Sequence, residues 1–584
     1  MLRIYILFQF IINIIHTHIF TYQKIEVQND TYIQHREVFK LYIHFISRRH
    51  PTSMATTATK SDAISDTTTQ EIGKAVERFH TFLSKAQLQR KEYQTEGIQF
   101  CLQNELSFLQ QSRCVRGGIV ADEMGLGKTI MMIGLIIANF QQRTLVVLPV
   151  ALVKQWEQQI LRTTGHKALV YYGADKKHIT QRMLQEAPVV ITTYGHMIRR
   201  DIHSTSSASS VSESTHTPTH RLYQLKWGRV IFDEAHHVRT PHTQIFKSVS
   251  TLKADIRWFV TGTPIQNSIR DFYALCSLLG LHSSYYANKD NLREIVKTYV
   301  LKRTKKSVGL SLPPLINNTI LVNWASHSEM ILSHNLHSGI GCLSIPALPD
   351  HDQEQEPQWF PEPCVAKIGR MIQAKQSCIY PRLACRNSVP KMPDTEDANY
   401  CSKISTVVHT IISRKDNMKR KIVFCHFRGE IDIIQKYLNI EDPDLVVRYL
   451  DGRTNENERR KILAPDADID VLILQIQTCC EGLNLQQFSE VYFVSPDWNP
   501  SVEDQAIARC HRFGQTEPVI VFRFIMAPFQ LQFSSTDAEM DTLVADSASA
   551  PPAEHPQLDT IETYTANIQN KKRIFADEVL NISS

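Results

Sequence analysis

Short runs of apolar and β-branched residues alternate along this chain with longer stretches of mixed polarity. In the first half, each such run ends at a polar or glycine turn. Continuous apolar character over the length of a strand is typical of parallel strands that helices cover on both faces. The pattern therefore predicts an α/β lobe built from βαβ units. Its predicted strands span residues 144–150, 188–194, 228–236 and 256–264.

The same alternation begins again after residue 403 and predicts a second lobe of the same class. Its predicted strands span residues 421–427, 446–452, 471–477, 490–496 and 518–525. The predicted fold class is therefore α/β, with two parallel-sheet lobes in tandem, helical insertions and disordered linkers.

Changes in composition divide the chain further. The first lobe is predicted at 79–302, an inter-lobe helical region at 303–402, the second lobe at 403–527, and a flexible segment with a final helix at 528–584. The Ser/Thr-rich stretch at 203–220 is predicted to be a disordered insertion within the first lobe. An acidic, proline-rich linker at 346–363 and a third polar stretch at 535–557 have compositions typical of linkers.

The N-terminal residues 1–78 are predicted to lie outside the working fold. The first twenty residues are apolar, but Gln9, Asn13, His16 and His18 interrupt them and no small-residue cleavage site follows. Our hypothesis is that translation of the functional protein starts at Met54. A membrane anchor is the alternative, although no membrane association is expected.

Composition limits the possible partners. The formal net charge is only +5, so any nucleic-acid contact must come from local patches rather than from a basic tail. The twelve cysteines include no C-x-x-C pair, so zinc-finger and RING-type sites lack their usual spacing. We expect no zinc, and thiols that remain reduced.

The candidate chemistry begins at "VADEMGLGKT", residues 120–129. This stretch nearly spells the phosphate-binding loop G-x-x-x-x-G-K-[ST], with Asp122 at the first glycine position. An apolar strand before it and a helix at 130–138 supply the expected context. Lys128 would reach the β- and γ-phosphates of ATP, and Thr129 would ligate Mg²⁺. The predicted nucleotide-binding residues are Asp122, Glu123, Met124, Gly125, Leu126, Gly127, Lys128 and Thr129.

A second acidic motif, "VIFDEAHH", ends a hydrophobic strand. Asp233 at this position would hold Mg²⁺, and Glu234 would orient and deprotonate the attacking water. A helix-capping carboxylate pair is the alternative, but the upstream loop favours the catalytic interpretation.

Longer motifs follow in a fixed order: "DEMGLGKT", "DEAHHVR", "TGTPIQNS", "YVLKRTKKSVGLSLPPL" and "DWNPSVEDQAIARCHRFGQ". Together they resemble the SWI/SNF-type ATPases, the double-stranded-DNA translocases of helicase superfamily two. Asp at the first loop position is that family's own spelling. The resemblance covers residues 88–525, with a weaker echo at 560–573, and implies two RecA-like lobes, ATP with Mg²⁺, and DNA-dependent ATP hydrolysis.

The resemblance also implies roles for single residues. Gln94 in "EYQTEGIQF" would read the adenine edge, and Gln505 would lie at the nucleotide site. Arg509 and Arg512 are expected on one face of a helix in the second lobe, as arginine fingers that stabilise charge on the γ-phosphate. The sequence "TGTP" at 261–264 would couple the nucleotide state to movement of the lobes.

DNA contacts are implied at both lobes. Thr193 in "VITTYGHM" would lie near a DNA phosphate, and the helix that carries Trp156 would lie near the DNA track. In the second lobe, Asn484 in "TCCEGLNLQ" is the residue most expected to contact the DNA strands. Cys479 and Cys480 replace the two glycines usual in the family. Glycines allow close approach to phosphates, so the replacement either alters the grip on DNA or is harmless variation in a turn.

The sequence as a whole predicts an ATP-dependent duplex-DNA translocase that remodels chromatin or other DNA-bound protein complexes. The expected partners are double-stranded DNA and nucleosomes or transcription and repair proteins, in a nucleus, or in the cytoplasm for a viral protein. A strand-separating helicase and a non-catalytic DNA-binding scaffold are the alternatives.

Overall fold

A computed structural model describes residues 54–106, 115–199, 218–338, 340, 365–384, 401–464, 466–479, 483–529 and 558–580. The chain forms two units, residues 1–69 and 70–584. The first unit contributes only the beginning of α3 (Met54–Lys85) to the described residues, and the other described helices and strands belong to the second unit. Residues 1–53, residues 203–217 of the insertion predicted at 203–220, and the whole of the two predicted linkers lie outside the described residues.

The first lobe is organised by a seven-stranded sheet in the order β3-β4-β2-β5-β6-β1-β7, in which all neighbours pair in parallel. Each strand predicted for this lobe is present, and β3 and β7 are short additions at the two edges. The strands are β1 (Gly117–Val120), β2 (Thr144–Leu148), β3 (Leu169–Val170), β4 (Val189–Thr193), β5 (Trp227–Asp233), β6 (Ala254–Val260) and β7 (Val300–Leu301).

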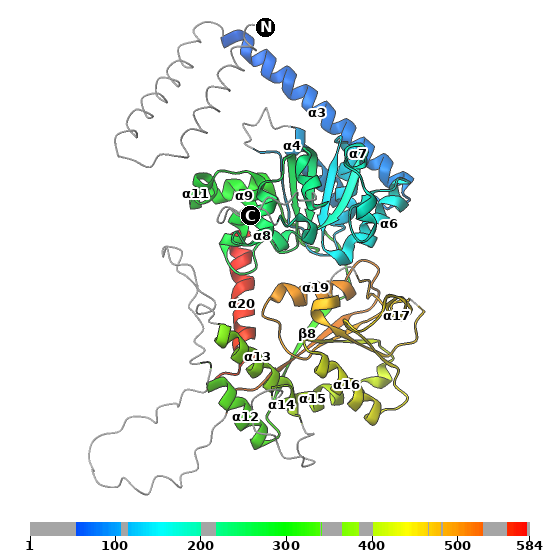
Figure 1. Ribbon diagram of the computed structural model, residues 1–584, viewed down its shortest axis with the longest axis vertical. Helices are drawn as coiled ribbons and strands as arrows, with labels where there is room; N and C mark the ends of the chain where they lie inside the picture. Colours follow the sequence, from blue (N-terminus) through cyan, green and yellow to red (C-terminus); the bar gives the residue numbers. More distant parts are fainter. Residues whose placement is uncertain are drawn as a thin grey trace, which may run out of the picture. The chain divides into compact units, whose positions relative to one another are not determined.

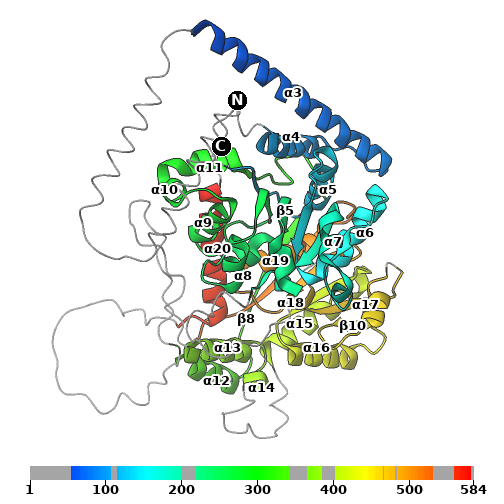
Figure 2. The ribbon, with the colours of Figure 1, turned by 45° about the horizontal axis from the view of Figure 1, so that its top comes forward.

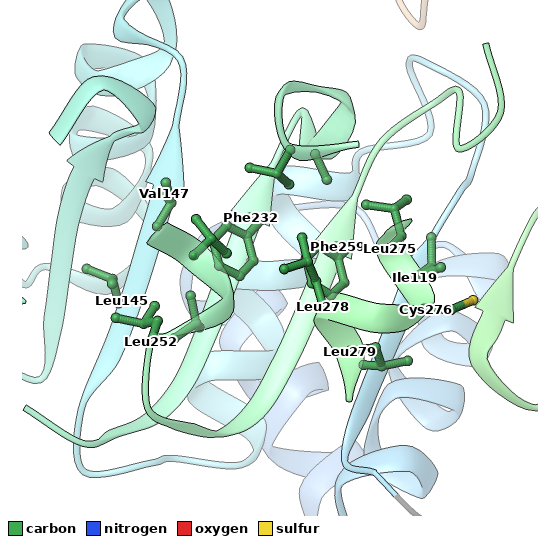
Figure 3. Packing of buried hydrophobic residues seen from close by; sticks show 14 of the residues in the cluster. Ile119, Leu145, Val147, Phe232, Leu252, Phe259, Leu275, Cys276, Leu278 and Leu279 are labelled. Atoms are coloured by element: carbon green, nitrogen blue, oxygen red, sulfur yellow. The ribbon is translucent and has the colours of Figure 1, made fainter. Parts of the chain in front are cut away.

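Helices cover both faces of this sheet, as the continuous apolar strands require. Along β1, Ile119 packs into the core on one face and Val120 into the core on the other. Figure 3 shows the first of these cores, where Phe232 and Phe259 on adjacent strands stack with ring centroids 5.1 Å apart beneath Leu278 of α9. The helices are α4 (Glu92–Leu106), α5 (Lys128–Ala138), α6 (Val153–Thr164), α7 (Gln181–Glu186), α8 (Gln244–Ser250), α9 (Ile269–Leu279), α10 (Ser283–Tyr286) and α11 (Lys289–Tyr299).

The core of the first lobe begins earlier in the chain than residue 79. Ala75 and Val76 of α3 are buried in the same hydrophobic cluster as Phe79 and Met131. The apolar spacing of one helix continues across the predicted boundary, so the last turns of α3 before residue 79 already belong to this lobe.

The second lobe contains a six-stranded parallel sheet in the order β10-β11-β9-β12-β13-β8. The five predicted strands are present. The sixth, β8, lies within residues 303–402, where the sequence predicted a helical region. Its central residues are polar because it is an exposed edge strand that buries only its last residue. The strands are β8 (Leu315–Val322), β9 (Lys421–Cys425), β10 (Val447–Leu450), β11 (Val471–Gln475), β12 (Glu490–Phe493) and β13 (Val519–Met526).

The predicted fold class, two parallel-sheet lobes in tandem, is confirmed. The helices that accompany the second sheet are α12 (His327–Ser338), α13 (Val365–Ile379), α14 (Pro381–Ala384), α15 (Ser402–Ile412), α16 (Arg428–Glu441), α17 (Glu456–Ile462), α18 (Ile476–Cys479) and α19 (Pro500–Cys510).

The last helix, α20 (Ile561–Leu580), packs against both lobes, and Figures 1 and 2 show it in red. Its first half places Ile561 and Ile568 in the core of the second lobe, where Glu562 forms a fully buried ion pair with Lys403. Its last residues, Val579 and Leu580, lie in the core of the first lobe. One helix therefore bridges the two hydrophobic cores.

The buried ion pair between Glu105 and Arg229 in the first lobe can be tested by its effect on stability. Both carboxylate oxygens of Glu105 accept hydrogen bonds from Arg229, at 2.7 and 2.5 Å, and neither side chain is exposed to solvent. Glu105→Ala leaves a buried guanidinium without its counter-charge, and we expect a loss of about 3–5 kcal/mol in unfolding free energy. Chemical denaturation followed by circular dichroism measures it. The control is Glu92→Ala in the same helix, whose exposed pair with Arg90 is worth at most about 1 kcal/mol. Equal losses would contradict the prediction.

Candidate active site

The loop between β1 and α5, residues 122–129 and here called the phosphate loop, adopts a conformation that only glycine allows at two positions. Gly125 has a φ of 94° and Gly127 a φ of 81°. A β-carbon at Gly127 would also lie 2.5 Å from Nε2 of Gln94. The loop leads directly into the N-terminus of α5, where unpaired backbone N–H groups favour an anion. The predicted strand, loop and helix are all present.

Asp122, which replaces the first glycine of the generic motif, is fully buried. Its two carboxylate oxygens accept hydrogen bonds from Nε and Nη2 of Arg303, at 3.1 and 2.6 Å. Arg303 also donates to the carbonyl of Tyr93, the residue before Gln94. Asp122 therefore anchors the loop instead of binding nucleotide directly.

Lys128 lies at the first position of α5 and points back under the loop. Its Nζ donates to the carbonyl oxygens of Asp122, at 2.7 Å, and Glu123, at 3.4 Å. Burial lowers the pKa of this lysine, while the carboxylates of Glu234, Asp122 and Asp233 act in the opposite direction. The side chain is thus held beside both the phosphate loop and the acidic pair.

The acidic pair follows β5. Asp233 accepts a hydrogen bond from the indole Nε1 of Trp156, at 2.7 Å, and one from the backbone N–H of Glu234, at 3.0 Å. Glu234 has a left-handed backbone with a φ of 51°, an uncommon conformation for a residue with a β-carbon. Such strain turns its side chain away from the strand direction and is frequent at functional sites. Oε2 of Glu234 lies 3.4 Å from Nδ1 of His236.

The surroundings shift the pKa values of Asp233 and Glu234 in opposite directions. Burial, and then the charge of Glu234, raise the pKa of Asp233. Burial would also raise the pKa of Glu234, but His236, Lys128 and Arg509 outweigh it and the pKa falls. Glu234 is therefore the more acidic of the two carboxyl groups, and both are acceptors that a metal ion or a water molecule could approach.

The arginines of the second lobe reach this site. A β-carbon at Gly125 would lie 3.8 Å from Cβ of Arg512. Arg509 is close enough to act on the pKa values of Lys128 and Glu234. The structure thus brings Lys128, Glu234 and both arginines together around one phosphate loop.

The prediction that Arg512 lies on the helix with Arg509 was wrong. Helix α19 ends at Cys510, and His511 leaves helical geometry with φ −90° and ψ 77°. The imidazole Nε2 of His511 contacts the carbonyl oxygen of Pro313 at 2.8 Å, which draws the chain out of the helix, and Gly514 follows with a φ of 99°. Arg512 therefore extends from a turn, and residues 509–512 are here called the arginine segment.

The two glutamines differ in their surroundings. Gln94 is buried at the start of α4, and its Nε2 donates to the carbonyl of Leu126 in the phosphate loop, at 3.3 Å. Gln505 is buried within α19, one turn before Arg509. The predicted adenine contact of Gln94 stays a prediction, and its position beside the loop is compatible with it.

The residues predicted to contact DNA differ in exposure. Thr193 ends β4, is buried, and its Oγ1 contacts Nδ1 of His196 at 2.9 Å, so a DNA phosphate would reach it only after that contact opened. Asn484 is exposed in the second lobe. Cys479 ends α18, and Cys480 lies outside the described residues.

Three further residues of the site were not assigned from the sequence: Trp156, Arg303 and Lys305. Trp156 was expected on a helix near DNA, yet its side chain is buried against Asp233. Arg303 and Lys305 belong to "LKRTKK", a motif that was recognised but given no role. The available signal was charge. The basic residues Arg303 and Lys305 could have been predicted to pair with the two acids of "DEMGLGKT", as they do in the structure.

These residues fit Mg²⁺-ATP. The two left-handed glycines leave a cradle that a β-carbon would fill, and a lysine and two arginines supply positive charge around it. Thr129 and Asp233 are hard oxygen ligands of the kind that Mg²⁺ prefers.

Known protein families match both lobes. Residues 93–347 match the family of the SNF2-related domain, and residues 402–514 match the helicase conserved C-terminal domain. The chain belongs to the SWI/SNF-type ATPases of helicase superfamily two. This confirms the family that the sequence motifs indicated.

Several curated SWI/SNF-type relatives are similar over most of this chain. A DNA excision repair protein ERCC-6-like from Danio rerio is 27% identical over 74% of this chain and 34% of its own length. DNA repair protein RAD5 from Candida albicans is 26% identical over 70% of this chain and 54% of its own length. The ATP-dependent DNA helicase DDM1 from Arabidopsis thaliana is 24% identical over 75% of this chain and 59% of its own length. The chain thus spans roughly a third to three-fifths of these relatives.

Among solved SWI/SNF-type structures, the Sulfolobus solfataricus SWI2/SNF2 ATPase core in complex with dsDNA is 23% identical. The match covers 75% of this chain and 88% of that one, with a TM-score of 0.34.

No helix in the described part of the present chain combines the length and apolar character needed to cross a bilayer.

The bond between Trp156 and Asp233 can be tested by comparing two buried tryptophans. Trp156→Phe removes a donor to a carboxylate, whereas Trp227→Phe removes a donor to the neutral carbonyl of Leu222. A hydrogen bond to a charged group contributes about 1.5–3 kcal/mol and a neutral one about 0.5–1.5 kcal/mol. We expect the larger loss of unfolding free energy for Trp156→Phe at pH 7, measured by chemical denaturation. A loss no greater than that of the control would refute this role of Trp156.

Proposed function

We propose that this chain is a DNA-dependent ATPase that uses Mg²⁺-ATP to move along double-stranded DNA and remodels chromatin or other DNA-bound protein complexes. The observation that carries the proposal is the arginine segment of the second lobe beside the phosphate loop of the first. An arginine that reaches the nucleotide only when two lobes approach makes hydrolysis depend on their relative position.

Each residue of the cluster has a role in this reaction. Lys128 would bind the β- and γ-phosphates, and Thr129 and Asp233 would hold Mg²⁺, which supplies positive charge to the phosphate oxygens. Glu234 would orient the attacking water and take its proton. Arg509 and Arg512 would stabilise the charge of the transferring phosphoryl group.

Movement of the lobes would follow from contacts that cross between them. The side-chain amide of Asn499 donates to Gln266 at 2.9 Å, and Lys572 of α20 donates to Asn267 at 3.0 Å. Both acceptors follow the "TGTP" turn at the end of β6. Changes at the nucleotide would thus be transmitted to the second lobe and to α20, and alternate closing and opening would advance the lobes along one strand.

Contacts with DNA would be mainly to phosphates, which makes binding salt-sensitive and nearly independent of sequence. Because the relatives are named for DNA repair and helicase activity, we propose DNA-bound protein complexes, including nucleosomes, as the physical targets. A nuclear location follows from such targets.

The proposed activity predicts ATP turnover that duplex DNA stimulates more than single-stranded DNA or RNA does. Lys128→Ala is expected to reduce the stimulated rate at least about 100-fold, because the γ-phosphate loses its principal cation. The matched control is Lys167→Ala, an exposed lysine of the same lobe. Steady-state phosphate release measures the rates. Turnover that no nucleic acid stimulates would remove the motor and leave a DNA-binding scaffold, and efficient unwinding of a plain duplex would instead indicate a strand-separating helicase.

The arginine fingers predict a separate kinetic effect. Arg509→Ala and Arg512→Ala should each lower kcat by about 10³-fold or more at saturating DNA, because an arginine finger acts on the transition state. The KM for ATP should change far less. Arg382→Ala, an exposed arginine of the second lobe, is the control. Full kcat in both finger variants would contradict the proposed catalytic role.

A further inference from the structure

Lys305 lies between the phosphate loop and the arginine segment, and no role has been assigned to it above. Its side chain is 11% exposed, in the segment of residues 302–314 that connects the two lobes and is here called the connecting segment. Its Nζ lies 3.1 Å from Oε1 of Glu123 in the phosphate loop. The same Nζ donates to the carbonyl oxygen of His511 at 3.1 Å. One ammonium group therefore joins the two halves of the site.

Lys305 itself is fixed firmly on the side of the first lobe. Its backbone N–H donates to Oε2 of Glu123 at 2.7 Å, and the backbone N–H of Glu123 donates to the carbonyl of Arg303 at 2.8 Å. Together with the ion pair of Asp122 and Arg303, these bonds bind the connecting segment to the phosphate loop at three successive points. The side chain of Lys305 is the part of this assembly that reaches the second lobe.

Within the second lobe, the backbone N–H of Leu485 donates to the carbonyl of Arg509 at 3.2 Å, and Nε2 of Gln515 donates to the carbonyl of Cys510 at 3.3 Å. A cavity of about 740 Å³ lies beside the arginine segment, and Lys305, Glu123, His511 and Ile507 are among the residues that line it. Helix α19 has already ended at Cys510, so helical hydrogen bonds no longer fix Arg512. The connecting segment adds two bonds at His511 from the side of the first lobe: Lys305 donates to its carbonyl, and the carbonyl of Pro313 accepts from its imidazole.

We propose that Lys305 is a positioning residue that holds the arginine segment in register with the phosphate loop, with Glu123 as its anchor. This inference rests on the proposed function, because positioning matters only if the arginines act on nucleotide. Lys305 would not contact the phosphates. It would set where Arg509 and Arg512 stand when the lobes close, so that closure delivers the guanidiniums to the γ-phosphate.

The test is a double-mutant cycle of DNA-stimulated ATP turnover with wild type, Lys305→Met, Arg512→Ala and the double variant. Met keeps the length and volume of the side chain and removes its charge. We expect Lys305→Met alone to lower kcat by about 10- to 100-fold with little change in the KM for ATP. In the Arg512→Ala background the same change should cost at least about threefold less than in the wild-type background, because one of the two guanidiniums that Lys305 positions is already absent. Lys306→Met, the exposed neighbouring lysine, is the control and should resemble wild type.

A second readout does not depend on activity. Amide hydrogen exchange of the nucleotide-free protein should be faster at residues 509–515 in Lys305→Met, and unchanged in β12 and in Lys306→Met. Additive losses in the kinetic cycle, or exchange at residues 509–515 equal to that of wild type, would overturn the inference. A wild-type protein without DNA-stimulated turnover would overturn the proposed function instead, and the exchange experiment would still decide whether Lys305 holds the arginine segment.

Discussion

The phosphate loop depends on the ion pair between Asp122 and Arg303. Asp122 is fully buried, and a carboxylate in that position is tolerated only if a cation and hydrogen bonds compensate its lost hydration. Arg303 supplies both, and its remaining donor reaches the carbonyl that precedes Gln94. A single guanidinium thus connects the loop, the start of α4 and the chain that leads to the second lobe. An aspartate where the generic motif has glycine is a structural requirement of this arrangement.

The link between Asp122 and Arg303 explains how the first lobe can influence the second. Beyond Arg303 the connecting segment carries Lys305 to the backbone of His511, and Pro313 accepts from the imidazole of the same histidine. On the opposite side, α20 places apolar residues in both cores. The two lobes are therefore joined by polar bonds at the nucleotide and by hydrophobic packing at α20. Polar bonds can be exchanged at small cost, whereas a helix buried in two cores cannot leave either one easily.

The sequence allowed the sheets to be predicted because buried parallel strands are continuously apolar. Each of the nine predicted strand runs is mainly apolar, and β8 escaped prediction for the opposite reason. Its polar centre, Asn317, Asn318 and Thr319, reflects an exposed sheet edge, which periodicity cannot distinguish from a loop. The early start of the first core, at Ala75, was missed because a polar N-terminal stretch and the first buried turns belong to one helix.

At the site, motif spelling predicted which residues meet, but not all of their neighbours. Lys128, Asp233, Glu234 and the arginines each belong to a short motif that can be recognised from a few neighbouring residues. Trp156 and Arg303 approach from positions 77 and 181 residues away from their partners, and such contacts depend on the tertiary fold. The end of α19 at Cys510 was equally hidden, since the bond between His511 and Pro313 that accompanies it joins residues far apart in the chain.

The central claim is that the first lobe grips a triphosphate and that two guanidinium groups of the second lobe complete the site. The most direct measurement is a structure of the protein with duplex DNA, ADP, Mg²⁺ and aluminium fluoride as a mimic of the transferring phosphoryl group. Guanidinium nitrogens of Arg509 and Arg512 within hydrogen-bonding distance of the fluoride atoms, opposite Lys128, are the predicted result. A closed complex in which both arginines point away from the fluoride, or in which the mimic binds outside the phosphate loop, would contradict the account.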